Sequence, residues 1–252
     1  MDFFRFGYGK RQLVILPGLS VQSVMLSADA IEKAYNSLTN DFTVFVFDRR
    51  SELPSNYSID DMAQDTAQAI IAAGIDRACI FGASQGAMMA VKIAARYPQL
   101  AEKLVLASAT DRITQADCET FETWIELAKA GKAERLYLSF GEAIYPPDVF
   151  DASRSLLIED AGSVTGSDLR RFVILAGAAF DFDAAEELED ITCPALVIGD
   201  TKDRIFGENA AEAVYDRLKK NPGTQLHLYN GCGHALYDTA PDFKERILQF
   251  LI

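Results

Sequence analysis

One serine, one histidine loop and a few aspartates carry the residue types that nucleophilic catalysis needs. Ser84 lies in the segment Gly82-Ala83-Ser84-Gln85-Gly86, with glycine two positions before it and two after it. This spacing is typical of a sharp turn from a strand into a helix, where glycine relieves crowding between the two elements. The turn would expose the serine hydroxyl and place the Gln85 N–H at the helix N-terminus, where partial positive charge favours an oxyanion. The alternative interpretation is an idle serine in a glycine-rich turn.

A serine hydroxyl needs a general base, and the chain has two histidines. His227 lies inside the strand-like run 225–230, where it is most simply a residue of the sheet. His234 follows that run in a glycine-flanked loop, which leaves the predicted sheet at the same carboxyl edge as the serine turn. We therefore expect His234 to be the base.

The imidazole in turn needs an acceptor that holds its tautomer and stabilises the imidazolium. Two aspartates, Asp200 and Asp203, follow the apolar run 194–199. Asp203 is the better candidate because it stands farther into the loop, clear of the strand end. Asp200 is the second choice, and Asp111, after the preceding apolar run, is the third. The resulting chain order of serine, aspartate and histidine is the one expected for a triad on an α/β sheet.

A second N–H donor for the oxyanion should come from the loop after the first long apolar run. There the segment 17–20 reads Pro-Gly-Leu-Ser, and Gly18 lets the backbone turn. The N–H of Leu19 is our candidate. A plain strand-ending turn is the alternative.

The apolar pattern alternates between two periods along most of the chain. Short runs rich in Val, Ile, Leu and Phe predict buried strands of a parallel sheet, at 12–17, 42–48, 77–82, 103–108, 194–199 and 225–230. Helical spacing separates these runs, at 59–73, 86–97, 208–220 and 239–251. The alternation predicts a doubly wound, mostly parallel α/β sheet. The opening residues read as a hairpin with the first long run, which would give the sheet an antiparallel edge strand.

Residues 111–183 break this alternation with helical patterns alone, which predicts an insertion of about four short helices. We expect residues 1–110 and 184–252 to form the core and 111–183 to form a helical cap. The insertion concentrates aromatic residues, whose simplest role is its own packing. We expect a few of them to line a substrate pocket instead, namely Trp124, Tyr137, Phe140 and Tyr145.

The composition of the chain limits the kinds of partner that the protein can bind. The chain of 252 residues has a formal net charge of −13, from 37 acidic and 24 basic residues. This balance argues against nucleic-acid and anionic-membrane partners, which demand basic patches. The N-terminus lacks the apolar run of a signal peptide, and no stretch is long enough for a membrane span. Four scattered cysteines favour free thiols in a reducing compartment, so we expect a cytoplasmic protein, with the cysteines at positions 79, 118, 193 and 232.

Taken together, these residues resemble the α/β-hydrolase fold superfamily over nearly the full chain. The resemblance rests on four segments: GASQG (82–86), VFVFDRR (44–50), CPALVIGDTKDRI (193–205) and GCGHALYDTAPDFKERILQFL (231–251). The insertion resembles the four-helix cap of 3-oxoadipate enol-lactonases, carboxylesterases and meta-cleavage C–C hydrolases. The resemblance implies a small-molecule site between cap and core, without cofactor or metal. It assigns the nucleophile to Ser84, the acid to Asp203, the base to His234 and the oxyanion N–H groups to Leu19 and Gln85.

The chain departs from the family pattern at three places. The usual His-Gly of the oxyanion loop is Pro17-Gly18, the usual glycine-rich turn is replaced in DRRSELPS (48–55), and Asp200 replaces the usual glycine before the acid loop. None of these changes touches the expected triad.

The expected reaction is acyl transfer to water on a small ester, lactone or thioester. Two alternatives keep the triad and change the reaction, to C–C bond hydrolysis or to cofactor-free perhydrolysis. A third is a ligand-binding protein on the same fold with little or no turnover. A nucleotide-binding α/β protein is disfavoured, because no phosphate-binding glycine motif follows a strand. No oligomeric state is predicted.

Overall fold

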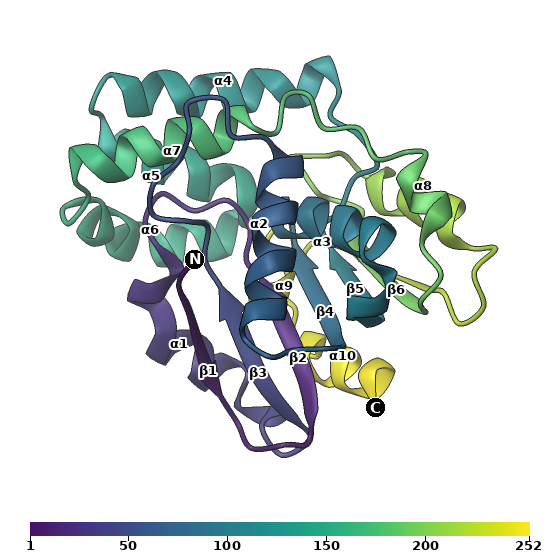
Figure 1. Cartoon of the computed structure of the whole chain (residues 1–252). Coiled ribbons are helices and arrows are strands. Elements are labelled where there is room, and N and C mark those ends of the chain that lie inside the picture. Colours follow the sequence, from purple (N-terminus) through teal and green to yellow (C-terminus); the bar gives the residue numbers. More distant parts are fainter.

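A computed structural model describes all 252 residues and contains a sheet of seven strands. Along the chain these are β1 (Phe3–Phe6), β2 (Arg11–Leu16), β3 (Phe42–Phe47), β4 (Ala78–Ala83), β5 (Ala101–Ala107), β6 (Ala195–Asp200) and β7 (Gln225–Tyr229). Their order across the sheet is β1-β3-β2-β4-β5-β6-β7, and every pair except β1 with β3 is parallel. This arrangement confirms the predicted doubly wound, mostly parallel sheet (Figure 1).

The antiparallel edge strand is present, but its partner differs from the expected one. β1 pairs with β3, not with β2, so the predicted hairpin is wrong. Both sides of β2 are already taken by β3 and β4. The connecting segment instead crosses the chain that enters β3, and the N–H groups of Tyr8 and Gly9 donate to the Thr39 carbonyl at 3.1 and 3.2 Å. A β-carbon on Gly9 would lie 2.0 Å from the Asp41 carbonyl carbon, so this crossing requires glycine.

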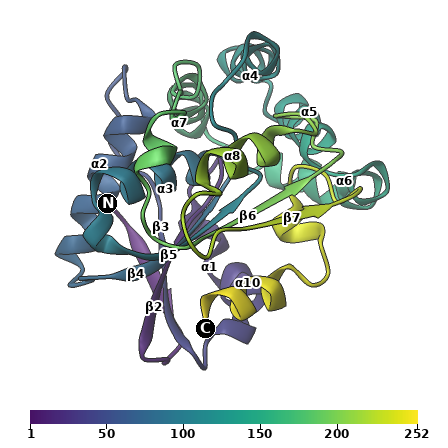
Figure 2. The ribbon, with the colours of Figure 1, turned by 90° about the vertical axis from the view of Figure 1, so that its right-hand side faces the viewer.

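Helices cover both faces of the sheet (Figure 2). One face carries α2 (Ile59–Ala72), α3 (Gln85–Arg96) and α8 (Ala210–Leu218), and the other carries α1 (Ala28–Ala34) and α10 (Phe243–Leu251). The last helix begins later than predicted, because Ala240-Pro241 separates it from the short helix α9 (Leu236–Thr239). None of the helices combines the length and hydrophobicity that a membrane crossing requires.

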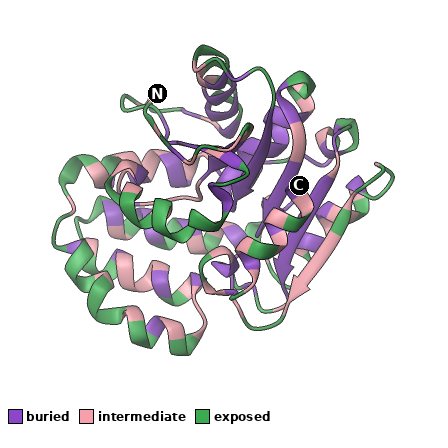
Figure 3. Ribbon diagram, turned by 90° about the horizontal axis from the view of Figure 1, so that it is seen from below, coloured by how far each residue is buried: buried purple, intermediate pink, exposed green.

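The core lies in two layers, one on each face of the sheet. Consecutive strand residues alternate between the two layers. Val14 and Leu104 pack on one face of the sheet, and their neighbours Leu13 and Val105 pack on the other. Every residue of β4 and β6 is buried, which explains why these runs show no polar alternation (Figure 3). A sheet whose central strands are covered on both faces provides a rigid edge for loops that carry chemistry.

Between β5 and β6 the chain forms four helices above the carboxyl edge of the sheet (Figure 1). They are α4 (Gln115–Lys129), α5 (Ala133–Ile144), α6 (Pro147–Ala161) and α7 (Gly166–Gly177). We call residues 111–183 the helical insertion. Its two ends meet, since the Ile113 N–H donates to the Phe182 carbonyl and the Ala184 N–H donates to the Asp111 carbonyl, both at 2.9 Å.

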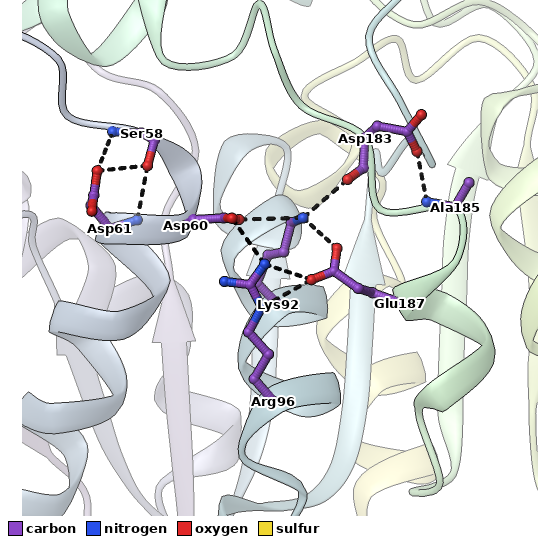
Figure 4. A network of polar contacts seen from close by, with 8 residues as sticks. All are labelled: Ser58, Asp60, Asp61, Lys92, Arg96, Asp183, Ala185 and Glu187. Atoms are coloured by element: carbon purple, nitrogen blue, oxygen red, sulfur yellow. Dashed lines mark hydrogen bonds and ion pairs between the residues drawn. The ribbon is translucent and has the colours of Figure 1, made fainter.

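A network of ionic contacts ties α2 and α3 to the chain that leaves the helical insertion (Figure 4). The Lys92 ammonium is nearly buried on α3 and donates to the Asp183 carbonyl at 3.0 Å. It also pairs with the Glu187 carboxylate and lies 3.3 Å from Asp60 Oδ1. Arg96, one turn farther along α3, pairs with the same two carboxylates. The network fixes the helix that begins directly after Ser84.

Candidate active site

The turn at Ser84 has the strained geometry that its flanking glycines predict. Ser84 adopts φ +52° and ψ −118° between β4 and α3. A β-carbon on Gly82 would lie 2.4 Å from the Gly86 carbonyl oxygen, and one on Gly86 would lie 1.9 Å from the Leu16 carbonyl oxygen. Two strands and the first turn of α3 therefore meet at distances that only glycine allows. Such strain is found where a fold holds a reactive group in place.

The structure brings Ser84, His234 and Asp203 together at the carboxyl edge of the sheet. His234 Nε2 lies 2.8 Å from Ser84 Oγ, and His234 Nδ1 lies 2.8 Å from Asp203 Oδ2. Because a carboxylate only accepts, the Nδ1–H donates to Asp203 and Nε2 accepts from the serine hydroxyl. His234 is 2% exposed, whereas Ser84 retains 9% of its surface. The arrangement can remove the serine proton during attack on a carbonyl carbon.

The loop after β6 keeps Asp203 ionised. Its second oxygen, Oδ1, accepts from the backbone N–H of Ile205 at 2.8 Å and from that of Phe206 at 3.2 Å. Burial raises the pKa of Asp203, but His234 and these backbone donors lower it more, so the net pKa is below its usual range. The carboxylate can therefore stabilise an imidazolium.

His234 is held by groups that the sequence analysis did not single out. Ser108, which ends the β5 run with φ +50°, donates its hydroxyl to the His234 carbonyl. The Phe206 ring packs edge-on against the imidazole, with ring centres 5.0 Å apart. Ser108 could have been identified from the sequence, because a small polar residue directly after a buried strand lies at the same sheet edge as the triad.

The alternative acids and the second histidine lie elsewhere. Asp200 accepts from the backbone N–H groups of Gly231 at 3.2 Å and Cys232 at 2.7 Å, so it shapes the loop that leads to the imidazole. Asp111 pairs with the Arg217 guanidinium at 3.0 Å. His227 lies in β7 and packs against the Tyr229 ring.

The two candidate oxyanion donors point to no acceptor within the protein. Neither the Leu19 N–H nor the Gln85 N–H donates a hydrogen bond. Gly18 faces the nucleophile, since a β-carbon built on it would lie 3.4 Å from Ser84 Cβ. Two free backbone donors beside a serine can stabilise a negative charge on a carbonyl oxygen.

Arg49 lies in the segment that departs from the family pattern. It connects the two segments that carry the candidate oxyanion donors. Its guanidinium Nη2 donates to the Pro17 carbonyl at 2.7 Å and to Gln85 Oε1 at 3.1 Å. Burial lowers the pKa of Arg49 to about 10, although the neighbouring Asp48 carboxylate raises it, so the group stays charged at neutral pH. Asp48 also pairs with Arg171 of α7 at 2.6 Å, which joins this segment to the helical insertion.

A cavity of about 560 Å³ lies between the core and the helical insertion. On the core side it is lined by Gly18, Leu19, Ala83 and Tyr237, so it reaches the residue that precedes Ser84 and the loop that carries the Leu19 N–H. Three of the four expected aromatic residues line it from the insertion, namely Tyr137, Phe140 and Tyr145.

The fourth expected aromatic residue, Trp124, does not reach the cavity. It is 2% exposed, and its ring packs against Phe121 and Phe140 with ring centres 5.4 and 4.6 Å apart. It lies on the face of α4 that builds the core of the helical insertion, so its expected place in the pocket is not met.

No group of three or more His, Cys, Asp or Glu side chains is arranged to hold a metal ion. The four cysteines are free thiols.

Known proteins resemble this chain in sequence over most of its length. A sequence model of the Alpha/beta hydrolase family matches residues 13–243. The "Putative carbamate hydrolase RutD" of Stutzerimonas stutzeri is 29% identical over 229 residues, which cover 85% of this chain and 83% of that protein. Its namesake from Agrobacterium fabrum is 27% identical over 86% of this chain and 85% of that protein.

Solved structures share the fold at lower identity. The α/β hydrolase MGS-M2 from a Medee basin deep-sea metagenome library has a TM-score of 0.85 at 22% identity, over 99% of this chain and 93% of that one. The enol-lactonase from Burkholderia xenovorans LB400 has a TM-score of 0.84 at 19% identity, over 99% and 95%.

Proposed function

Because this chain belongs to the alpha/beta hydrolase family, we propose that it is a serine hydrolase that cleaves a small carboxylic ester, lactone or thioester. The observation that carries the proposal is the continuous line of contacts from Ser84 Oγ through His234 to Asp203, each 2.8 Å long. We take residues 111–183 as a cap that closes the substrate pocket over a catalytic core of residues 1–110 and 184–252.

In the first half of the reaction, Ser84 attacks the substrate carbonyl while His234 Nε2 takes the hydroxyl proton. Asp203 stabilises the imidazolium that forms. The negative charge that develops on the carbonyl oxygen is met by the N–H groups of Leu19 and Gln85. Donors of this kind are each worth roughly 3–4 kcal/mol of the barrier. His234 then protonates the leaving alcohol, thiol or ring oxygen, which leaves an acyl group on Ser84.

In the second half, water replaces the leaving group. His234 removes a proton from the water, which attacks the acyl carbonyl within the same oxyanion donors. Collapse of the intermediate releases the carboxylic acid and returns the proton to Ser84. The chain's own residues supply every proton transfer in this scheme.

A second candidate substrate class is the carbamates. The relatives that cover about 85% of this chain carry a name that proposes carbamate hydrolysis. A carbamate presents the same carbonyl to Ser84 and would leave a carbamoyl group on it, so the machinery above needs no change. Product analysis separates both candidates from C–C bond hydrolysis and perhydrolysis, which use the same three residues.

The experiment that tests the proposal is a screen of p-nitrophenyl esters, thioesters, lactones and carbamates beside the Ser84→Ala variant. We expect at least one class to turn over and the variant to lose that turnover while it keeps its circular-dichroism spectrum and melting temperature. Turnover that survives in Ser84→Ala would place the nucleophile elsewhere. A protein that binds these compounds without converting any of them would support a ligand-binding role instead.

A further inference from the structure

The wall of the cavity between the core and the helical insertion carries acidic but no basic side chains. Among its 26 lining residues there is no lysine, arginine or histidine. There are two carboxylates, Asp160 and Asp238, and four tyrosines, at positions 35, 137, 145 and 237. Sixteen of the lining residues are hydrophobic, so charge on this wall comes from the two aspartates alone. A cavity of this kind is suited to a cation, because carboxylates pair with it and tyrosine ring faces attract it.

Asp238 is the carboxylate closer to the chemistry along the chain. It lies on α9, four residues after His234 in the sequence. Its carboxyl group makes no hydrogen bond and no ion pair, and it remains exposed where it lines the cavity. The buried acids of the site are all satisfied, as Asp203 and Asp200 show. An acceptor left without a partner on the wall of this cavity is available to a ligand.

The groups around Asp238 leave its carboxylate ionised and available for pairing with a ligand. Desolvation by the surrounding protein raises its pKa to about 6, and Lys244 lowers it, so the group is ionised at neutral pH. Lys244 does not line the cavity. Its ammonium donates to the Tyr237 carbonyl and lies 5.4 Å from the centre of the Tyr35 ring. The other neighbours are Tyr145 and Tyr237, and burial raises the pKa of both hydroxyls.

We propose that Asp238, with the tyrosines of the same wall, forms a subsite for a positively charged part of the substrate. The preferred ester then carries a quaternary or primary ammonium group, and an ester with a second carboxylate is disfavoured. This inference rests on the proposed function of Ser84 and specifies which esters that serine meets.

The test uses substrates that differ only in charge. One pair is the p-nitrophenyl ester of 4-(trimethylammonio)butyrate and its carbon isostere, the ester of 5,5-dimethylhexanoate. A second pair carries the charge on the leaving group: butyrylthiocholine and its isostere S-(3,3-dimethylbutyl) thiobutyrate. The p-nitrophenyl monoester of glutarate supplies the anionic case. The fixed charge of the ammonium groups keeps the substrates themselves from titrating.

We expect at least one cationic ester to exceed its isostere in kcat/KM by about tenfold or more, and the glutarate monoester to be the poorest substrate. Asp238→Asn should bring that ratio close to one. Asp160→Asn is the matched control, because it removes a carboxylate from an exposed position of the same wall. The Asp160→Asn variant should keep most of the preference for the cationic ester over its isostere.

The ratio should also fall as the pH is lowered through about 6, where Asp238 takes up a proton. Dividing the kcat/KM of the cationic ester by that of its isostere cancels any titration of the triad that affects both esters equally. A ratio near one for both pairs, or a preference that Asp238→Asn leaves intact, would overturn the subsite.

Binding separates failure of the subsite from failure of the proposed hydrolysis. Equilibrium titration of Ser84→Ala with the cationic and neutral p-nitrophenyl esters reports the subsite without turnover. Tighter binding of the cationic ester, lost in Ser84→Ala/Asp238→Asn, supports the subsite even if the wild-type chain hydrolyses neither ester. Equal binding of the two esters contradicts the subsite even if both are hydrolysed rapidly.

Discussion

Arg49 donates a hydrogen bond to the Gln85 side-chain oxygen at 3.1 Å, and the same nitrogen donates to the Pro17 carbonyl at 2.7 Å. One guanidinium thus holds both segments that carry the candidate oxyanion donors. Gln85 Nε2 in turn donates to the Leu175 carbonyl of α7 at 2.7 Å, so the helical insertion contacts the same unit. Arg49 is a positioning residue in this account, because it acts on the reaction through the loop and not on the substrate.

Arg49→Lys is expected to lower kcat by roughly 10- to 100-fold with a smaller change in KM, since lysine keeps the charge but loses the fork that reaches two acceptors. Steady-state kinetics on the best ester from the screen measures this. Arg50→Lys, on the exposed neighbour, is the control and should behave like the wild type. A change in KM alone would mean that Arg49 affects binding and not the oxyanion donors.

Asp203→Asn should lower kcat by roughly 10³- to 10⁴-fold, because the amide no longer fixes the imidazole tautomer or stabilises its charged form. Asp200→Asn should cost less activity and about 1–3 kcal/mol of stability, since it weakens the contacts to the loop before His234. Rates and urea midpoints of both variants separate these effects. Equal loss of kcat in the two variants would contradict the different roles we give them.

Gly86→Ala should destabilise the protein by about 3 kcal/mol or more and abolish activity, because its β-carbon would lie 1.9 Å from the Leu16 carbonyl oxygen. Gly177→Ala in α7 is the matched control. No atom lies within 4 Å of the added β-carbon there, so the change should be neutral or slightly stabilising. Thermal melts of the two variants provide the measurement, and a Gly86→Ala protein as stable as the control would contradict the close packing of β2 against α3.

Glu187→Ala should lower the free energy of unfolding by about 1–3 kcal/mol, because the nearly buried Lys92 ammonium loses a carboxylate partner. Activity per folded molecule should change little, because Lys92 lies about two helical turns along α3 from Ser84. Glu186→Ala, at an exposed neighbour, should leave the urea midpoint within error. If both variants shifted equally, general surface charge would explain the effect better than the network around Lys92.

Local patterns in the sequence were sufficient for the parts of the site that depend on local geometry. The glycine spacing around Ser84 specifies a strand, a turn and a helix, and the structure has each of them there. His234 was identifiable because the only other histidine lies inside a strand. Asp203 was preferred over Asp200 from its place in the loop, and the contact of Asp203 with His234 agrees with that preference.

The parts that the sequence did not reveal depend on contacts between distant segments. The partner of β1 is decided by which strand of the sheet still has a free edge, and no local pattern encodes that. Trp124 and Phe140 both have helical spacing in the insertion, yet only the packing of α4 and α5 decides which ring faces the cavity. The unpaired Asp238 is likewise visible only once α9 is seated beside the tyrosines.

The proposed mechanism requires Ser84 to be the nucleophile, and covalent labelling tests this directly. The protein is treated with a fluorophosphonate probe, digested, and the modified peptide is identified by mass spectrometry. We predict one probe per chain, attached to Ser84, with loss of ester hydrolysis in proportion to labelling and no labelling of Ser84→Ala. Hydrolysis that continues after complete labelling, or a probe attached to a residue other than Ser84, would contradict it.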